Sequence, residues 1–209
     1  MKMMQSRYLL TLLFVFLIGT VSAAKVDGMP PGVDIYSAAE VGNGQTCLVG
    51  AKLDEDGMNE MPIAFLRAPN PNRNLLWSKS LEIPSATYQG RATHCAASPN
   101  ALFVLVQSDT QPQQTLTQTL LQLFKLDKKN GRVISEKDVI VPGVSAAYTA
   151  WVDEGASNLS VKGDRVVITG KYDLLSNRSA PAGKTAETFS VDVSEDLTST
   201  NDDAKPSEK

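Results

Sequence analysis

Hydrophobic and polar residues alternate with a period of two along most of the chain between residues 34 and 194. Successive side chains of a β-strand point to opposite faces, so this alternation predicts half-buried strands. Gly, Pro, Asn and Asp residues separate most of the segments, as turns require. A helix over 115–126 is the one competing interpretation, but the Thr- and Gln-rich start of that segment favours a loop and a strand. We predict ten strands, at 46–54, 61–67, 75–83, 88–96, 101–107, 120–127, 133–141, 146–152, 165–172 and 187–193.

A weak internal repeat runs through these segments. Residues 80–84 (Ser-Leu-Glu-Ile-Pro) resemble residues 138–142 (Asp-Val-Ile-Val-Pro), and small residues, an aromatic residue and a strand follow each. The unit is roughly 50–60 residues long, a period found in propeller blades. We therefore predict an all-β fold, an incomplete, about three-bladed β-propeller-like stack of antiparallel sheets. Propellers normally close with four or more blades, so a β-sandwich is the alternative.

The two ends of the chain depart from this pattern. Residues 1–23 combine Lys2 and Arg7 with a short apolar stretch and Val-Ser-Ala before a cleavage point, the pattern of a secretory signal peptide. The apolar run is shorter than the about 20 residues that cross a membrane, so no membrane insertion is expected after cleavage. We predict an irregular arm at 24–33, an all-β domain at 34–194 and a disordered acidic tail at 195–209. These features indicate a periplasmic protein.

Composition and charge narrow the function classes. The chain has 209 residues and a formal net charge of −3, and removal of residues 1–23 with their two basic groups leaves 186 residues and −5. Nucleic acid is not an expected partner, because it requires a clustered basic surface. One His and two Cys fall short of the four ligands of a structural zinc site, and we predict no metal and no cofactor. A cluster of four basic residues surrounds a predicted hairpin turn. We expect these side chains to be solvated, and a docking patch for a partner is the alternative. They are Lys125, Lys128, Lys129 and Arg132.

The two cysteines, Cys47 and Cys95, both lie in the part of the chain expected to be exported. Disulfides persist outside the cytoplasm, so we predict a Cys47–Cys95 bridge that closes a loop of about 50 residues. Two buried free thiols are the alternative. We assign the pair no redox role, because the chain has no C-x-x-C.

The sequence contains none of the common catalytic motifs. His94 is the only imidazole, and its place in a strand beside Cys95 favours a structural role. Trp77 and Trp151 lie in apolar segments that are predicted to be strands, and we expect both to be core residues. The carboxylates of residues 54–56 suit a hairpin turn better than a calcium loop, because the ligand spacing of an EF-hand is missing. We predict no catalytic residues and no enzyme activity.

A polar loop carries the sharpest hypothesis about function. Residues 108–119 are almost entirely polar and uncharged, and the segment is longer than the 2–5 residues usual for hairpins. Ser, Thr and Gln form hydrogen bonds without the desolvation cost of a charge, which suits insertion into a polar cleft. Loops after residues 54 and 174 occupy equivalent corners of the repeat, so all three are expected at one end of the stack. The alternative is that this loop is only a flexible linker. We predict that it binds a partner through Ser108, Asp109, Thr110, Gln111, Gln113, Gln114 and Thr115.

The layout of the chain resembles the periplasmic immunity proteins that neutralise type VI secretion amidase effectors. The resemblance rests on a signal peptide, a small all-β chain, a disulfide, propeller-like sheets and a hairpin loop that contains Ser108. It covers residues 104–108, the loop that follows, and 123–127 to 136–138. In that family a protruding loop plugs the active-site cleft of the effector, which implies Ser108 as the plugging residue here.

Three functions follow from these observations. The first is an immunity or inhibitor protein that occludes the active site of a secreted cell-wall-degrading effector, such as an amidase, by loop insertion. The second is a propeller-like scaffold or adaptor in envelope assembly, which would bind a protein partner through its sheet edges. The third is an enzyme that uses His94, which requires an accessible imidazole in a concave pocket. Open sheet edges also leave a homodimer open as an alternative.

Overall fold

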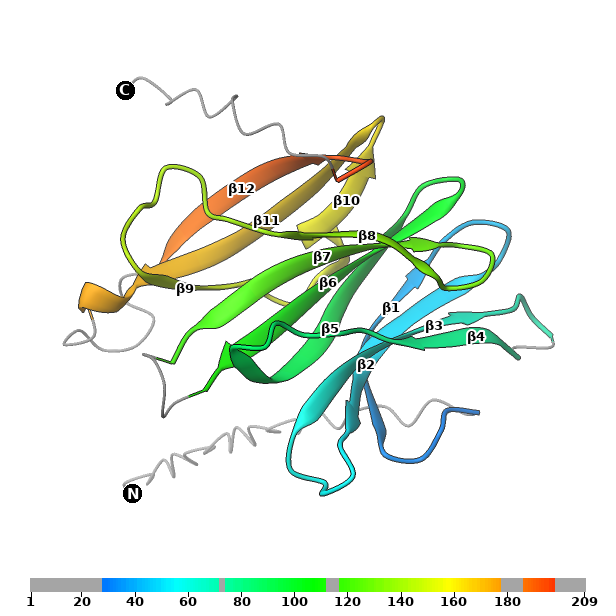
Figure 1. The fold of residues 1–209 in the computed structure, drawn as a ribbon. Helices are drawn as coiled ribbons and strands as arrows, with labels where there is room; N and C mark the ends of the chain where they lie inside the picture. The colour runs from blue at the N-terminus through cyan, green and yellow to red at the C-terminus, as the bar shows by residue number, and fades with distance from the viewer. Residues whose placement is uncertain (1–27, 72–73, 112–116, 178–185, 198–209) are drawn as a thin grey trace, which may run out of the picture.

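The computed structural model of the chain describes residues 28–71, 74–111, 117–177 and 186–197, which form three antiparallel sheets of four strands each (Figure 1). The N-terminal sheet contains β1 (Val33–Glu40), β2 (Thr46–Leu53), β3 (Glu60–Arg67) and β4 (Leu75–Ser80). The middle sheet contains β5 (Thr87–Ala97), β6 (Ala101–Thr110), β7 (Thr119–Asp127) and β8 (Val133–Asp138). The C-terminal sheet contains β9 (Tyr148–Trp151), β10 (Leu159–Lys162), β11 (Arg165–Leu174) and β12 (Glu187–Ser194).

In the first two sheets, each strand pairs with the next one along the chain. In the C-terminal sheet, β9 and β10 both pair with β11, opposite residues 171–174 and 165–168 respectively. They therefore form one interrupted first strand, and the 3-10 turn η1 (Ala156–Asn158) lies in the break; a second such turn, η2 (Leu175–Asn177), follows β11. Three successive antiparallel sheets confirm the predicted all-β fold, and their open arrangement is consistent with an incomplete propeller-like stack or with a sandwich.

All ten predicted strands are present, and their ends differ from the prediction by three residues at most. Two strands were not predicted. In β1, the small residues of 37–39 weaken the contrast between polar and apolar positions, and β10 is only four residues long. Residues 119–126 belong to β7, so the competing helix is wrong there.

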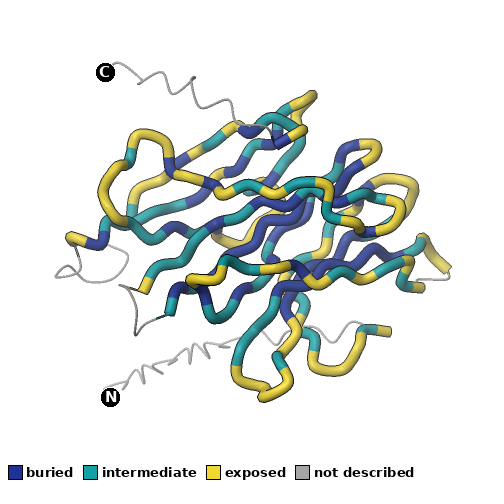
Figure 2. Tube along the Cα trace, in the orientation of Figure 1, coloured by how far each residue is buried: buried dark blue, intermediate teal, exposed yellow. Residues whose placement is uncertain are grey.

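The middle sheet packs against a neighbouring sheet on each face. Along β6, Leu102, Val104 and Val106 pack against the N-terminal sheet, at what we call the first interface. Phe103 and Leu105 pack against the C-terminal sheet, at the second interface. Because both faces are covered, residues 101–106 form a continuous apolar run rather than an alternating one. Figure 2 shows the resulting pattern, with buried central strands and exposed hairpin ends.

The internal repeat corresponds to two equivalent connections between sheets. Leu81 follows β4 and donates its backbone N–H to Pro62 of β3 (2.9 Å), and Val139 follows β8 and donates to Leu121 of β7 (2.9 Å). Leu81 is buried at the first interface and Val139 at the second. Each repeat therefore carries the chain from the last strand of one sheet to the first strand of the next.

The predicted disulfide is confirmed. Cys47 of β2 and Cys95 of β5 are bonded, with a Cα–Cα distance of 6.5 Å and a separation of 48 residues. Both belong to the apolar cluster of the first interface. The bridge therefore joins the N-terminal sheet to the middle sheet covalently.

The ends of the chain lie partly outside the described residues, which include neither 1–27 nor 198–209. Residues 195–197, expected to begin the tail, instead form a turn in which Glu195 donates its N–H to the Asp164 carbonyl (2.7 Å). Leu197 is buried against the second interface, so residues 195–197 belong to the folded part of the chain; the rest of the predicted tail, residues 198–209, lies outside the described residues. None of the described helical segments is long and apolar enough to span a membrane.

Candidate functional site

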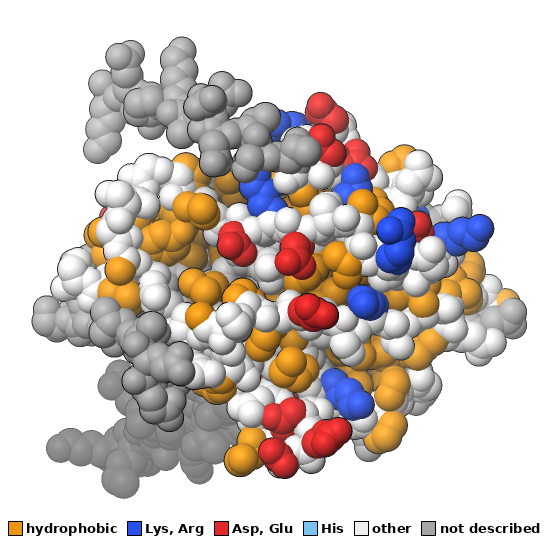
Figure 3. Space-filling view, viewed as in Figure 1, with side chains coloured by type: hydrophobic (Ala, Val, Ile, Leu, Met, Phe, Trp, Pro, Cys, Tyr) orange, Lys and Arg blue, Asp and Glu red, His pale blue; other side chains and the backbone are white. Residues whose placement is uncertain are grey.

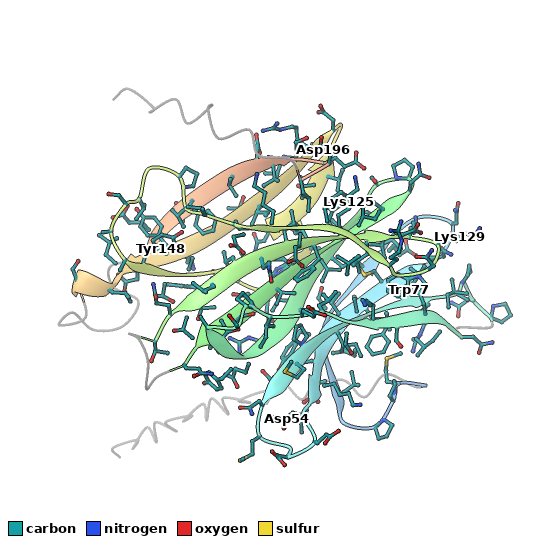
Figure 4. The ribbon with its side chains drawn as sticks, in the orientation of Figure 1. Asp54, Trp77, Lys125, Lys129, Tyr148 and Asp196 are labelled. Carbon is teal, nitrogen blue, oxygen red and sulfur yellow. A yellow bond between two sulfur atoms is a disulfide. The ribbon has the colours of Figure 1, made fainter. Side chains whose placement is uncertain are left out.

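Three hairpins lie on one side of the stack, and we call them the hairpin rim: β2–β3, β6–β7 and β11–β12 (Figure 1). Asp54, at the end of the N-terminal sheet's hairpin, and Tyr148, at the start of β9, mark this side in Figure 4. Trp77 and Lys129 mark the opposite side. The strand ends that flank the three loops lie on one side because the three sheets are all antiparallel. Of the loops themselves, residues 112–116 and 178–185 lie outside the described part of the chain.

The polar loop begins later than the sequence predicted. β6 continues to Thr110, so Ser108, Asp109 and Thr110 are strand residues, and the loop starts at Gln111. Ser108, 1% exposed, faces the interior, where a Cβ on Gly90 would lie 2.7 Å from its Oγ. In this conformation Ser108 and the buried Thr110 offer no surface to a partner, whereas Asp109 and Gln111 are half-buried. Three other predicted binding residues lie outside the described part of the chain: Gln113, Gln114 and Thr115.

The base of the β6–β7 hairpin is held on both of its strands. Thr110 donates its N–H to the Gln118 carbonyl (2.9 Å), and Gln118 donates its own to the Thr110 Oγ1 (2.9 Å). The Gln118 side chain donates to the Tyr148 carbonyl (2.7 Å), and the Thr119 N–H donates to Thr149 Oγ1 (2.9 Å). These bonds attach the hairpin base to β9 of the C-terminal sheet.

A charged group lies beside this base, at the junction of the N-terminal and middle sheets. The Nη1 of Arg91 on β5 lies 3.7 Å from Glu60 of β3 and 3.6 Å from Asp109 of β6. The three side chains are one-third exposed or less. One guanidinium thus lies between two carboxylates from different sheets.

Other polar side chains hold both carboxylates in place. Tyr36 donates its hydroxyl to Glu60. Partial burial and this hydrogen bond raise the pKa of Tyr36 well above its usual value, although the residue as a whole is 40% exposed. Asp109 accepts from Gln89 Nε2 (2.9 Å) and from Thr119 Oγ1 (2.8 Å). The positions of both carboxylates are therefore fixed by neighbours as well as by Arg91.

The first strands of the three sheets surround a cleft of about 190 Å³. Each strand is irregular there. The register of β1 shifts around Tyr36, that of β5 shifts around Thr93, and residues 152–158 interrupt the strand formed by β9 and β10. Bulges bend a strand and redirect its side chains, and they are frequent beside binding sites. All three irregularities line this cleft, together with Ser37, Arg91, His94 and Gln107.

A buried hydrogen-bond network joins the middle and C-terminal sheets beside the cleft. The Gln107 amide accepts from the Val152 N–H (3.1 Å) and donates to the Val152 carbonyl (3.2 Å) and to Thr93 Oγ1 (3.0 Å). His94 Nε2 lies 3.0 Å from the Asp153 carbonyl, which can only accept, so Nε2 carries the proton. His94 Nδ1 then accepts from the Thr93 hydroxyl (3.0 Å).

His94 is 3% exposed, and both of its ring nitrogens have partners. Burial lowers the pKa of His94, with the nearby Asp153 carbonyl and the Glu154 charge acting in the opposite direction. Protonation would place a second N–H against Thr93, whose hydroxyl already donates there. The imidazole therefore serves as a neutral connector between two sheets in this structure.

The acidic turn after β2 is explained by its own hydrogen bonds. Asp54 accepts from the Met58 N–H (3.0 Å) and from Asn59 Nδ2 (2.6 Å), and the bond from Met58 is the main cause of its lowered pKa. Asp54 thus shapes the turn. Among the residues that the structure describes, no group of three His, Cys, Asp or Glu residues is placed to hold a metal ion.

The basic turn between β7 and β8 lies on the side opposite to the rim. Lys128 donates Nζ to the Val41 carbonyl, and Trp77 Nε1 donates to the Lys128 carbonyl (3.1 Å). Lys125 lies over the Phe103 ring, 5.8 Å from its centroid. Two of the four basic residues are therefore engaged by the fold. On the face shown in Figure 3, charges of both signs are interspersed with apolar side chains.

Sequence reasoning identified His94 but missed the other residues that line the cleft. The signal available was an unusual strand: β5 carries polar residues at every second position from 87 to 93, where a solvated face is expected. The strand faces the cleft there, so the polar row contains Arg91 and Thr93. The bulges that bring Tyr36 and Thr93 to one place have no sequence signature. Comparisons of the chain with family models, with characterised proteins and with solved structures find no match.

Proposed function

We propose that this chain is an exported, periplasmic inhibitor, an immunity protein that blocks a secreted cell-wall-degrading effector by inserting the β6–β7 loop into its active site. The observation that carries the proposal is the anchored base of that hairpin. Gln118 and Thr119 bind β9, while Asp109 is held by Gln89 and Arg91. Fixing both ends of a loop reduces the entropy that binding removes, so a held loop binds more tightly than a free one.

The other supports are the disulfide and the N-terminal sequence. A Cys47–Cys95 bridge is typical of proteins that function outside the cytoplasm. The charge and hydropathy pattern of residues 1–23 is that of a signal peptide that directs export. In this proposal inhibition is by occlusion. The uncharged polar loop fills the effector's cleft, and no covalent chemistry takes place.

The test replaces residues 111–117 with Asn-Gly. Thr110 and Gln118 form a hydrogen-bonded pair in register, which a two-residue turn closes without moving β6 or β7. The targets are candidate secreted cell-wall hydrolases, beginning with any that is encoded beside this chain, and each is assayed on its cell-wall substrate. Unaltered protein is expected to abolish hydrolysis at a one-to-one ratio, and the shortened variant to need at least about a hundred-fold more protein, the loss of about 2.7 kcal/mol of binding.

The matched control is Lys129→Ala on the opposite side of the stack, where the lysine contributes its backbone N–H, not its side chain, to the turn. This variant is expected to inhibit like the unaltered protein. Both variants should melt within a few degrees of it, because surface loops tolerate changes in length. Full inhibition by the shortened variant would show that the loop is not the binding element. No inhibition by the unaltered protein would overturn the proposed function.

A further inference from the structure

We propose that the cleft between β1, β5 and residues 152–155 is a second binding site, and that it holds a carboxylate on the open edge of the Arg91 guanidinium. The site shares Asp109 with the base of the β6–β7 hairpin, but it includes none of the loop residues 111–117. Its ligand is the C-terminal residue of a peptide or a small N-acylated amino acid. Both present a carboxylate next to an amide N–H.

Arg91 has an unused side that matches a carboxylate. Glu60 and Asp109 both approach Nη1, at 3.7 and 3.6 Å, distances too long for direct hydrogen bonds. No described residue accepts a hydrogen bond from Nε or Nη2 of Arg91. These two N–H groups are parallel and fit the two oxygens of one carboxylate, the strongest way in which arginine binds an anion.

Two carboxylates with fixed positions also flank the guanidinium before any ligand arrives. Glu60 is fixed by the Tyr36 hydroxyl, and Asp109 by Gln89 and Thr119. The Arg91 side chain is 33% exposed and lines the cleft, so a ligand in the cleft can reach it. A group that is already oriented loses little freedom on binding, which favours affinity from a small contact.

The size of the cleft selects a small group. Its volume is about 190 Å³, whereas sites for drug-sized molecules span roughly 300–1,000 Å³. The floor is rigid, because Gln107 bonds Val152 through both atoms of its amide. A single terminal residue is therefore a better fit than a larger molecule.

Glu154 supplies the second recognition element, a hydrogen-bond acceptor for the ligand's amide N–H. It lines the same cleft, is exposed, and makes no ion pair with any described residue. Its negative charge disfavours a bare anion, but it accepts a hydrogen bond from an amide N–H next to the carboxylate. The pair Arg91 and Glu154 thus selects a carboxylate that carries a neighbouring donor over acetate or phosphate.

The experiment is a titration of the ¹⁵N-labelled protein, followed by the Nε–Hε resonance of Arg91 and the backbone amides of Ser37, Thr93 and Gly155. The probes are N-acetyl-alanine, its C-terminal amide, and the tetrapeptide acetyl-Ala-Ala-Ala-Ala with a free carboxylate. We expect saturable shifts of these resonances with the two carboxylates and none with the amide. Tighter binding of the tetrapeptide would assign the ligand to a chain terminus, and tighter binding of N-acetyl-alanine to a free acid.

Two variants distinguish specific binding of a carboxylate at Arg91 from a general effect of the protein's charge. Arg91→Lys keeps the charge but loses the paired donors, and its affinity should fall about ten-fold or more, as expected for one hydrogen bond to a charged group. Arg132→Gln, which removes a charge from the turn on the opposite side, is expected to bind as the unaltered protein does. Equal shifts with the amide, shifts away from the cleft, or unchanged affinity in Arg91→Lys would each overturn the proposal. The first of these tests needs no variant, so it does not depend on how Arg91→Lys folds.

Discussion

The two interfaces of the stack are held together by different chemistry. The first interface combines an apolar cluster with the Cys47–Cys95 disulfide. The second has an apolar cluster too, but no described disulfide crosses it, and buried hydrogen bonds from Gln107 and His94 join its two sheets. A disulfide responds to reductant, whereas a buried imidazole responds to protons. Two equivalent contacts in a repeated fold can therefore be sensitive to different conditions.

The difference between the two interfaces also affects the cleft, because each interface holds one of its walls. Residues 152–155 form one wall of the cleft, and Gln107 and His94 hold them against the middle sheet. The opposite wall, formed by β1, belongs to the disulfide-bonded interface. The shape of the cleft therefore depends on both interfaces, and loosening either one should weaken binding there.

Removing a large side chain at the second interface should have the greatest effect. Phe103 is fully buried there, and Phe103→Ala should lower the free energy of unfolding by about 3–5 kcal/mol, from lost burial and a cavity. Phe124→Ala, at the first interface, should cost a similar amount, because the apolar part of the two interfaces is alike. Urea denaturation followed by fluorescence measures both. Ile134→Ala, at a site 46% exposed, is the control and should change stability by less than about 0.5 kcal/mol.

Removing the disulfide should have the second largest effect on stability. Replacing Cys47 and Cys95 by Ala should lower the free energy of unfolding by about 2–4 kcal/mol, mainly because the unfolded chain gains freedom. Dithiothreitol should destabilise the unaltered protein and leave the double variant unchanged. Equal melting temperatures for the unaltered protein with and without reductant would contradict the role assigned to the bridge.

Gln107→Leu should have the next largest effect. The change keeps much of the volume but leaves the buried N–H and carbonyl of Val152 without the partners that Gln107 provides, at a cost of about 1–3 kcal/mol. Gln122→Leu is the matched control on the neighbouring strand, since the Gln122 Oε1 is buried and has no hydrogen-bond partner. Gln122→Leu should lower the free energy of unfolding by less than Gln107→Leu does. The reverse order would contradict the importance of the network.

The protonation of His94 should have the smallest effect. Because burial lowers its pKa below the usual value of 6.5, the unfolded chain takes up a proton before the folded protein does. The stability from neutral His94 is complete above about pH 6.5 and is lost as the pH falls toward the lowered pKa. Urea midpoints between pH 7.5 and 5.5 should therefore decline. His94→Gln should flatten this decline, and an equal slope in the variant would contradict the assignment.

Ten of the twelve described strands could be predicted from the sequence, whereas the arrangement of the site could not. Alternation and turn residues locate elements such as 101–107 and 120–127, because burial of one or both faces leaves a direct trace in residue type. Ser108 was misplaced because polar residues also occur in buried strand ends, where Gly90 makes room for a hydroxyl. Arg91, Tyr36 and Glu154 come together only through two register shifts and a broken strand. Such irregularities depend on tertiary packing and have no local signal.

The most direct test of the difference between the interfaces is hydrogen–deuterium exchange, read separately for the N-terminal and C-terminal sheets and corrected for intrinsic rates. Reduction at pH 7.5 is expected to speed exchange in β2 and β3 while leaving β11 nearly unchanged. Lowering the pH to 5.5 with the disulfide intact is expected to speed exchange in β10 and β11 while leaving β2 nearly unchanged. Equal acceleration of both sheets under either condition would contradict the account, because it would show that the two interfaces open together.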